Sequence, residues 1–299
     1  MKHVFGSRDP NAEVVILYGN CQTLYLAHLL ASADSPQSGR SYVVGLNHAM
    51  PGEEIDPVEP SFLRRCTLYL EQYDEAKELP ARELIRQGIP RGTPQITFPP
   101  LVMHSFWPFE VYEPRARRTE HYPLARFPFG DRIGLEVIRQ KLTGDAAYDA
   151  YMRLSREQMP DIWQRLDFDF SKMASRDLAS DIRMSDFFSM CWRGLHLFWT
   201  WGHPSREPMA LLGSRLYETA HPVLGGDLAM GLRIVEEQSD FLGGMKPYQL
   251  PVHPLIVETL DLGFGGPEMK YEWFDERWTF KEYMTRYLAY DENWGHLGY

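Results

Sequence analysis

The feature that most constrains the fold of this chain is a short apolar run that ends abruptly at a Gly-Asn pair. Residues 13–18 (EVVILY) are mostly β-branched, aliphatic or aromatic, which predicts a buried strand. Gly19 and Asn20 interrupt the run, and residues 21–31 are compatible with a helix. A buried strand, a tight turn and a helix form the repeating unit of α/β proteins. The chain is therefore expected to contain a sheet covered by helices.

Three further segments have the composition of strands, at 41–46 (SYVVGL), 66–72 (CTLYLEQ) and 95–98 (QITF). Segments of helical or loop character separate them. Strands joined in this way favour a mainly parallel sheet that is covered on both faces.

After about Gly130 the pattern becomes helical. The clearest helix is the last, in WTFKEYMTRYLAY, where Thr279 and Glu282 form a capping box before an apolar face. The predicted fold class is α/β. We expect residues 1–135 to form the sheet core that carries the Cys-containing turn, and residues 136–299 to form a helix-rich half packed on it as one compact unit.

Composition restricts the classes of partner. Among 299 residues, 31 are Lys or Arg and 41 are Asp or Glu, which gives a formal charge of −10. Nucleic acids and anionic membranes require a cationic face, so neither is expected as the main partner. The longest apolar-rich stretch, at 187–201, is interrupted by Arg193 and His196 and falls short of the roughly 20 apolar residues of a membrane span. No transmembrane segment is predicted.

The three cysteines are too few and too scattered for a disulfide framework, which suits a reducing compartment. The N-terminal residues contain no long apolar run before a small-residue cleavage site, so no signal peptide is predicted. A soluble protein of the cytoplasm is expected.

Cys21 is the strongest candidate for a reactive residue. It lies at the first turn of the expected helix, at the carboxyl end of the first strand, where open α/β sheets bind ligands. Free backbone N–H groups and the helix dipole there favour a thiolate, a developing oxyanion or a phosphate. Gly19 permits the turn, Asn20 suits a helix cap or an oxyanion donor, and Gln22 offers another amide. The alternative is that Cys21 is a small apolar residue of the core, the interpretation favoured for Cys66 and Cys191.

A thiolate nucleophile requires a proton acceptor, and three histidines have suggestive settings. His48 ends the second strand, His104 follows the fourth strand among prolines and aromatic residues, and His203 directly precedes a helix that Ser205 caps. Each of them is equally compatible with a loop histidine bonded to the backbone. At least one is expected to be the partner of Cys21.

The run RARR at 115–118, with Arg126 and Arg132 nearby, is either a phosphate-binding patch or a solvated loop. The motifs GxxxxGK[ST], GxGxxG after a strand, HExxH and GxSxG are all absent. Nucleotide hydrolysis, dinucleotide redox chemistry and zinc proteolysis therefore have no sequence support, and no metal is expected.

The chain resembles the WcbI-type family of polysaccharide biosynthesis, whose members are proposed acetyltransferases of capsule assembly. The likeness is distributed over nearly the whole chain. It consists of YGNCQ (18–22), EQYDE (71–75), TFPPLVMHSFWP (97–108), YPLARFPFGDR (122–132), LFWTWGHPS (197–205), LPVHPLIVETLDLGF (250–264) and WTFKEYMTRYL (278–288). Pro100 and Gly202 stand where the family pattern often has Asn, so any polar contact of those positions is lost or moved.

The resemblance implies an SGNH-hydrolase or flavodoxin-like core with additional helices, and an enzyme that binds coenzyme A beside the Cys of the GNCQ motif. By residue, it implies Cys21 as the nucleophile or the residue facing the thioester, with Asn20 and Gln22 in its anion-binding turn and Gln72 at the same edge. It also implies a base among His104 and His203. Arg126, Asp131 and Arg132 match the GDR-containing segment, where they either bind the ligand or brace the fold.

Taken together, these features predict a coenzyme A-dependent O-acyltransferase that uses acetyl-CoA or another acyl-CoA and acts on a sugar hydroxyl. Transfer proceeds either through an acyl-cysteine or directly to the sugar. Two alternatives use the same turn: a thiol esterase or deacylase, and a non-catalytic module that binds coenzyme A or a sugar nucleotide. The sequence does not specify the acceptor sugar, the acyl chain or the oligomeric state.

Overall fold

The structure is a computed structural model that describes residues 3–34, 39–48, 55–76, 79–240 and 248–290. The chain forms two compact units, each assembled from three separate stretches. Unit 1 comprises Met1–Val102, Phe170–Cys191 and Gly202–Met245, and unit 2 comprises Met103–Asp169, Trp192–Trp201 and Lys246–Tyr299. The units therefore interleave along the sequence, and the expected domains over 1–135 and 136–299 stay a prediction.

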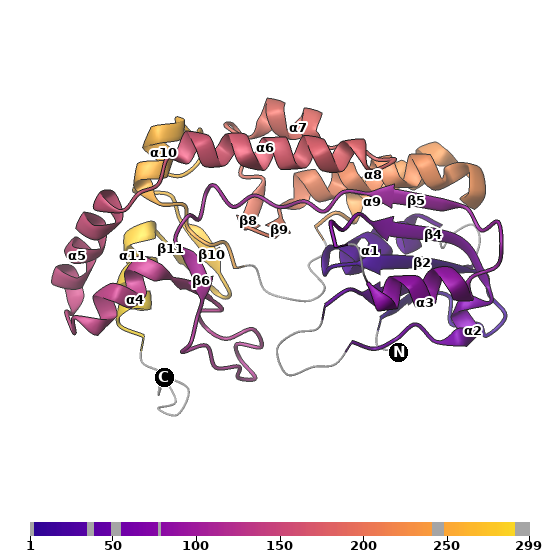
Figure 1. Ribbon diagram of the computed structural model, residues 1–299, viewed down its shortest axis with the longest axis horizontal. Helices are drawn as coiled ribbons and strands as arrows, with labels where there is room; N and C mark the ends of the chain where they lie inside the picture. Colours follow the sequence, from indigo (N-terminus) through magenta and orange to yellow (C-terminus); the bar gives the residue numbers. More distant parts are fainter. Residues whose placement is uncertain (1–2, 35–38, 49–54, 77–78, 241–247, 291–299) are drawn as a thin grey trace. The chain divides into compact units, whose positions relative to one another are not determined.

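Unit 1 is built on a five-stranded sheet (Figure 1). Its strands, in the order in which they lie side by side, are β1 (Val4–Gly6), β3 (Ser41–Leu46), β2 (Val14–Gly19), β4 (Cys66–Gln72) and β5 (Gln95–Phe98). The last four are parallel and β1 is antiparallel to β3. All four strands predicted from the sequence are confirmed. The short edge strand β1 was not predicted, because three residues are too few to show a period.

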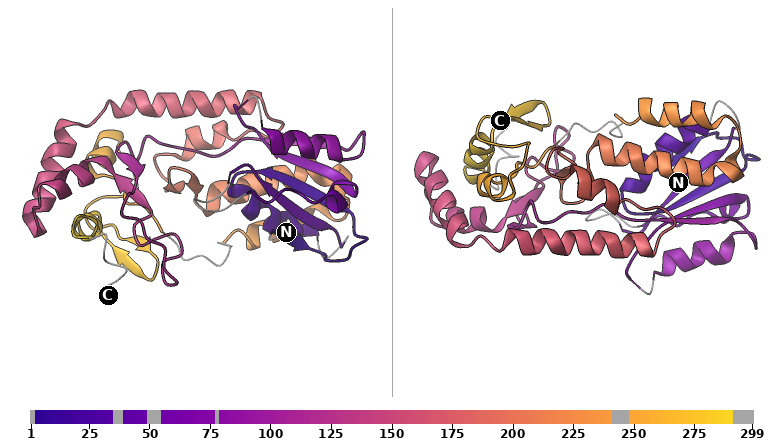
Figure 2. Two further views of the ribbon diagram at one scale, coloured as in Figure 1. Left: turned by 60° about the horizontal axis from the view of Figure 1, so that its bottom comes forward. Right: turned by 90° about the horizontal axis from the view of Figure 1, so that it is seen from above.

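Helices cover both faces of this sheet, as Figures 1 and 2 show. Helices α2 (Pro60–Leu63) and α3 (Pro80–Gly88) lie on one face, and α1 (Gln22–Asp34), α8 (Arg206–Leu224) and α9 (Leu228–Glu237) pack together on the other. Alternation along β2 supplies both faces with apolar side chains. Ile16 and Tyr18 join the core beneath α3, where Ile85 is buried. Unit 1 also contains the end of α6 (Ile162–Leu178), α7 (Ser185–Cys191) and the short strand β9 (His203–Pro204).

The strand order places the end of β2 at a switch in the direction of winding. From β2 the chain passes to β3 on one side and then to β4 on the other. In open α/β sheets, such a switch at the carboxyl ends of the strands is where ligands bind. The mainly parallel α/β core is confirmed, and the finer assignment to an SGNH-hydrolase or flavodoxin-like fold stays a prediction.

Unit 2 is mainly helical with small antiparallel ribbons. Its elements are β6 (Glu110–Tyr112), β7 (Phe129–Asp131), α4 (Arg132–Arg139), α5 (Gly144–Glu157), the first part of α6, β8 (Phe198–Thr200), α10 (Pro254–Leu260), β10 (Tyr271–Trp273), β11 (Glu276–Trp278) and α11 (Phe280–Leu288). Pairing joins β6 to β7 and β10 to β11. The core is aromatic: Phe127 is surrounded by the rings of Trp273, Trp278, Tyr283, Tyr287 and Tyr290.

Helix α11 begins as the sequence predicts. The Thr279 hydroxyl accepts a hydrogen bond from the N–H of Glu282, and the Glu282 carboxylate accepts one from the N–H of Thr279. This capping box satisfies two N–H groups that the helix itself leaves without a partner. Among the described residues, no helix is long and apolar enough to cross a membrane.

Candidate functional site

The turn between β2 and α1 carries the candidate site. Gly19 is required there because the side chain of Gln72 lies close to its Cα atom. A Cβ atom at this position would lie 2.5 Å from Cβ and 2.8 Å from Oε1 of Gln72, at the end of the neighbouring strand β4. The φ angle of Gly19 is not in the left-handed region. Glycine is therefore needed for space and not, as the sequence suggested, for the conformation of a sharp turn.

Asn20 caps the turn that starts α1. Its Oδ1 accepts a hydrogen bond from the N–H of Gln22 at 2.9 Å, and its backbone oxygen accepts from both the N–H and the hydroxyl of Thr23. The Asn20 N–H donates to Oε1 of Gln72 at 2.9 Å. Its side-chain Nδ2 makes no hydrogen bond to any described residue. The capping role is thus confirmed, and one amide group remains available to a ligand.

Gln22 uses its whole side chain to hold neighbouring loops in place. Its Nε2 donates to the backbone oxygens of Leu101 at 2.7 Å and Gly202 at 2.9 Å. Its Oε1 accepts from the N–H of Leu101 at 3.1 Å and from Nε2 of Gln72 at 3.3 Å. The side chain is buried, and both of its donor positions are occupied within the fold. Gln22 therefore positions the turn, and its predicted contact with a cofactor stays a prediction.

These loops bring His203 to Cys21. The Sγ atom of Cys21 lies 3.8 Å from Nε2 of His203, although 182 positions separate them in the sequence. His203 lies in β9, directly before helix α8, as predicted. The backbone N–H groups of Cys21 and Gln22 are directed at the sulfur. Both side chains are partly buried. Of the three candidate histidines, His48, His104 and His203, it is His203 that contacts the thiol.

Burial controls the protonation of this pair. Desolvation raises the pKa of the Cys21 thiol, and this effect exceeds the lowering by the two N–H groups. Burial, followed by the charge of nearby His48, lowers the pKa of His203 to about 4. At neutral pH the free protein therefore holds a thiol beside a neutral imidazole. The backbone donors at this turn lower the thiol pKa, as the sequence predicts, and desolvation outweighs them in the free protein.

Two further residues gather at the ends of the adjoining strands. His48, which follows β3, is exposed, and its Nδ1 lies 2.8 Å from Oδ1 of Asn47. The N–H of Asn47 donates to the Gly19 oxygen at 2.8 Å, and Asn47 Nδ2 donates to Asp74 at 3.1 Å. Asn47 was not among the candidate residues of the sequence. The pattern that could have identified it is an Asn directly after a buried strand, the same position that Asn20 has after β2.

His104 belongs to unit 2. Its imidazole stacks on the indole of Trp201, with ring centroids 4.9 Å apart and an angle of 14° between the planes. The N–H groups of His104 and Ser105 both donate to Oδ2 of Asp169, at 2.9 and 2.8 Å. His104 lines a groove formed by residues of unit 2 alone. A catalytic role for His104 stays a prediction.

Arg126 and Arg132, predicted to contact the cofactor, also lie in unit 2. The guanidinium of Arg126 lies over the rings of Tyr122 and Trp278, and 3.8 Å from Glu276. That of Arg132 donates to Gln158 at 2.5 Å and lies over Phe109. Asp131 caps α4 by accepting from the N–H of Gly134 at 2.7 Å. Among the described residues, no cluster of three or more His, Cys, Asp or Glu could hold a metal ion.

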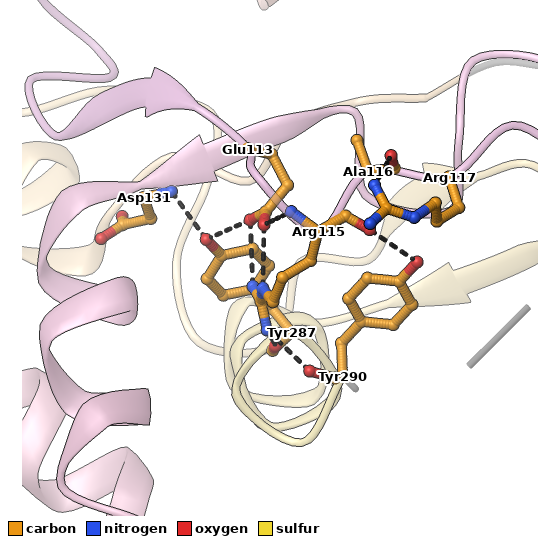
Figure 3. A network of polar contacts seen from close by, with 7 residues as sticks. All are labelled: Glu113, Arg115, Ala116, Arg117, Asp131, Tyr287 and Tyr290. Carbon is orange, nitrogen blue, oxygen red and sulfur yellow. Dashed lines mark hydrogen bonds and ion pairs between the residues drawn. The ribbon is translucent and has the colours of Figure 1, made fainter. Parts of the chain in front are cut away.

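Arg115 has neither of the roles considered for the basic run. It is buried and forms a paired ion contact with Glu113, through Nε at 2.8 Å and Nη2 at 2.9 Å (Figure 3). Its Nη1 donates to the backbone oxygen of Tyr290 at 2.7 Å, and the hydroxyl of Tyr287 donates to Glu113 at 2.7 Å. The prediction of a phosphate patch or a solvated loop is wrong for Arg115, because these partners use its charge to anchor the end of α11.

The protein thus has a mainly parallel α/β sheet with a cysteine–histidine pair at the carboxyl end of its middle strand, the edge at which open α/β sheets generally bind ligands. The model of the family described as polysaccharide biosynthesis enzyme WcbI matches residues 14–222, and the chain belongs to this family. The resemblance noted in the sequence is thereby confirmed.

A solved structure of WcbI is similar to this chain. The TM-score is 0.64 at 15% identity, and the match covers 94% of this chain and 91% of that one. At this identity the likeness shows the fold alone. That protein is described as a novel polysaccharide biosynthesis enzyme, in a native form without a disulfide bond between coenzyme A and one of its cysteines. No curated protein matches the sequence.

Proposed function

We propose that this protein transfers an acetyl or other short acyl group from coenzyme A to a sugar hydroxyl, in the biosynthesis of a capsule or similar polysaccharide. The observation that carries the proposal is the contact between Cys21 Sγ and His203 Nε2 at the ligand-binding edge of the sheet. Membership of a polysaccharide biosynthesis family supports the acceptor class. The description of the similar WcbI structure, which mentions a cysteine and coenzyme A together, supports the donor.

Among the three cysteines, Cys21 is the one suited to this reaction. Cys66 is buried in strand β4, where its thiol donates to the Leu68 oxygen, and burial raises its pKa to about 11. Cys191 ends helix α7 and does not directly follow any of the parallel strands in the sequence. Cys21 is partly exposed and free, which also fits a reducing compartment, and we assign the protein to the cytoplasm on this ground.

In the covalent version, His203 removes the thiol proton as the sulfur of Cys21 attacks the thioester carbonyl. The carbon–sulfur bond to coenzyme A then breaks, and the leaving thiolate takes the proton from the imidazolium. Next, His203 accepts the proton of the sugar hydroxyl as its oxygen attacks the acyl-cysteine. The Cys21 sulfur leaves and recovers the proton. With a pKa of about 4, the His203 imidazole is neutral at pH 7 but weakly basic, so bound substrate must raise its pKa before it accepts a proton in each half-reaction.

The oxyanion of each tetrahedral intermediate needs a donor that the fold does not already use. Asn20 Nδ2 is such a donor, since it has no hydrogen bond to the described residues. Gln22 and Gln72 hold the turn in position and do not contact the oxyanion, because their side chains bond to each other and Gln72 also bonds to the N–H of Asn20. In the direct version, His203 deprotonates the sugar hydroxyl and Cys21 only orients the donor.

Calorimetric titration with coenzyme A tests the donor, using the wild type and Cys21→Ala. Saturable binding in the micromolar range is expected for both proteins, since the thiol is proposed to act in chemistry and the remaining turn would still hold the ligand. Cys191→Ala is the matched control and should bind as the wild type does. Absence of binding at millimolar coenzyme A would refute the acyltransferase and favour a thiol hydrolase that uses other esters.

A further inference from the structure

His48 is a candidate histidine that the proposed reaction does not use, and it follows the strand next to the reactive turn. Strands β2 and β3 run parallel with Gly19 level with Leu46, and the N–H of Asn47 donates to the Gly19 oxygen at 2.8 Å. Cys21 and His48 thus each follow the end of one of these strands by two residues. Neighbouring strands lie about 4.8 Å apart, so the sheet brings both residues to the same edge.

His48 also acts on the cysteine–histidine pair through its charge. In its protonated form it lowers the pKa of His203, so the two imidazoles lie within electrostatic range of each other. Cys21, His48 and His203 all belong to unit 1. The His48 side chain is exposed, and the loss of hydration over its covered part lowers its pKa from 6.5. At pH 7 it is therefore neutral, accessible to a ligand and able to exchange a proton with water.

A chain of hydrogen bonds fixes the tautomer of the His48 ring. Oδ2 of Asp74 lies 3.1 Å from Nδ2 of Asn47, and a carboxylate only accepts hydrogen bonds, so the amide turns its NH₂ group to Asp74. The amide oxygen of Asn47 lies 2.8 Å from Nδ1 of His48, and this oxygen can only accept. The proton of the neutral ring is therefore on Nδ1. Nε2 carries the lone pair and makes no hydrogen bond to any described residue.

The covalent version of the proposed reaction takes a proton from the thiol and later one from the acceptor, and His203 is placed for the first of these. Its Nε2 lies 3.8 Å from Cys21 Sγ. Its pKa of about 4 makes it a weak base towards a hydroxyl group, because general bases work best with a pKa near the working pH. His48 offers a second lone pair at the same edge, on a ring that Asn47 and Asp74 orient as a third group orients a catalytic base.

We infer that His48 is the base of the second half-reaction and takes this step over from His203. The acceptor oxygen bonds to the acyl carbon of acyl-Cys21 as its proton passes to Nε2 of His48, and the bond between that carbon and the sulfur then breaks. His48 releases the proton to water, and the Cys21 thiolate takes one from water. The inference rests on the covalent version of the proposed function and leaves the first half-reaction to His203.

Discharge of acetyl-Cys21 tests this assignment without the natural sugar. The full-length protein is acetylated with acetyl-CoA or, separately, with p-nitrophenyl acetate, rapidly desalted and mixed with glycerol. Loss of the acetyl group from the Cys21 peptide is followed by mass spectrometry. His48→Gln should gain the adduct at the wild-type rate and discharge it to glycerol and water about 10²-fold more slowly. The matched control is His121→Gln, an exposed histidine 3.9 Å from Asp275 in unit 2, which should discharge as the wild type does.

Hydroxylamine separates the loss of a base from damage to the site. It attacks thioesters at neutral pH without a base, so it should discharge the wild type and His48→Gln equally fast. Asn47→Ala, which releases the His48 ring, should slow discharge to glycerol severalfold and leave discharge to hydroxylamine unchanged. Equal slowing of both reactions in His48→Gln would place the defect in the site as a whole and overturn the inference.

The pH profile identifies the group that takes the proton. The titratable groups around His48 are Cys21, His203 and, through Asn47, Asp74. Discharge of the wild type to glycerol should fall as the pH drops through the His48 pKa, with a midpoint below pH 6.5, because a protonated Nε2 cannot accept. His48→Gln should lose this acid limb. A limb that persists in His48→Gln, or a discharge rate that the substitution leaves unchanged, would overturn the inference and return the step to His203.

The two donors separate this inference from the proposed function. An adduct from p-nitrophenyl acetate but none from acetyl-CoA would refute the coenzyme A donor alone, because discharge is then still measured and still decides the role of His48. No adduct on Cys21 from either donor would refute the covalent version and, with it, the role of His48.

Discussion

The Cys21–His203 pair and the Arg115–Glu113 pair are both polar pairs removed from water, and they differ in how fully they are bonded. Arg115 and Glu113 share two hydrogen bonds of 2.8 and 2.9 Å, and Tyr287 and Tyr290 supply further partners to the pair (Figure 3). Cys21 and His203 share a single sulfur contact of 3.8 Å. The first pair is charged and joined by two short hydrogen bonds, and the second is a thiol and a neutral imidazole joined by one long contact.

This difference indicates a structural role for the Arg115–Glu113 pair and a chemical role for the Cys21–His203 pair. A buried charge is tolerated only where its partners are in place, so a fully bonded pair is evidence of a structural role. A thiol and a neutral imidazole joined by one long contact contribute little to the fold, and a pair of this kind at the carboxyl edge of a parallel sheet is a candidate for chemistry. The two pairs should therefore respond in opposite ways to substitution.

The largest effect is expected on chemistry at Cys21. In the covalent version, Cys21→Ala removes the nucleophile, and the single-turnover release of coenzyme A from acetyl-CoA should fall at least about 10³-fold. Tm should change little. Intact-mass spectrometry should show an acetyl adduct on the wild type and on Cys191→Ala but not on Cys21→Ala. Residual transfer above about a tenth of the wild-type rate would instead establish the direct version.

The next effect is on stability at Arg115. Arg115→Met leaves the Glu113 carboxylate buried without its ion partner, which should lower the free energy of unfolding by about 3–5 kcal/mol in denaturant titration. The double variant Glu113→Gln, Arg115→Met should recover part of this loss, because no unpaired charge remains. Alkylation of Cys21 in the folded protein should be unaffected. A loss below about 1 kcal/mol would contradict a structural role for the pair.

Asp131, whose N–H donates to the hydroxyl of Tyr287, tests the same region through pH. Burial raises its pKa from 3.8 to about 6. The folded state thus holds this proton more tightly than the unfolded chain, and the resulting stability is present below pH 3.8 and lost as pH rises through about 6. Relative to Asp131→Asn, the wild type should lose at most about 3 kcal/mol of unfolding free energy between pH 4 and pH 7.

Asp227→Asn is the control for this measurement. Asp227 also caps a helix, by accepting from the N–H of Met230 at 3.0 Å, but it is exposed, so the substitution removes no buried charge. Its difference from the wild type should not follow the same pH curve. An identical curve for both variants would show that the effect belongs to helix capping in general.

The smallest effect concerns the ionisation of Cys21. The rate of alkylation by iodoacetamide, followed on the Cys21 peptide, should rise with a midpoint above pH 9, because burial raises the thiol pKa from 9.0. His203→Ala should move this midpoint by less than about one unit, since a neutral imidazole supplies no charge. A midpoint below pH 7 that rises on removal of His203 would show a preformed thiolate–imidazolium pair.

Much of unit 1 follows from local sequence patterns. The four parallel strands and the helix after Cys21 were predicted near their observed bounds, and the capping box at Thr279 and Glu282 is present as predicted. These features depend on residues a few positions apart, through side-chain alternation, turn composition and helix capping. The same patterns placed Cys21 at the carboxyl edge of the sheet.

What the sequence by itself determined is therefore the strand, the turn and the cysteine at its end. The tertiary structure alone decided that, of the three candidate histidines, His203 contacts the thiol. It also decided that the Gln22 side chain bonds to the loops at Leu101 and Gly202, and that Arg115 is buried. It also decided that Cys21 is protonated in the free protein. Contacts across 182 positions and the desolvation of a side chain depend on how the whole chain packs, and no local pattern records that packing.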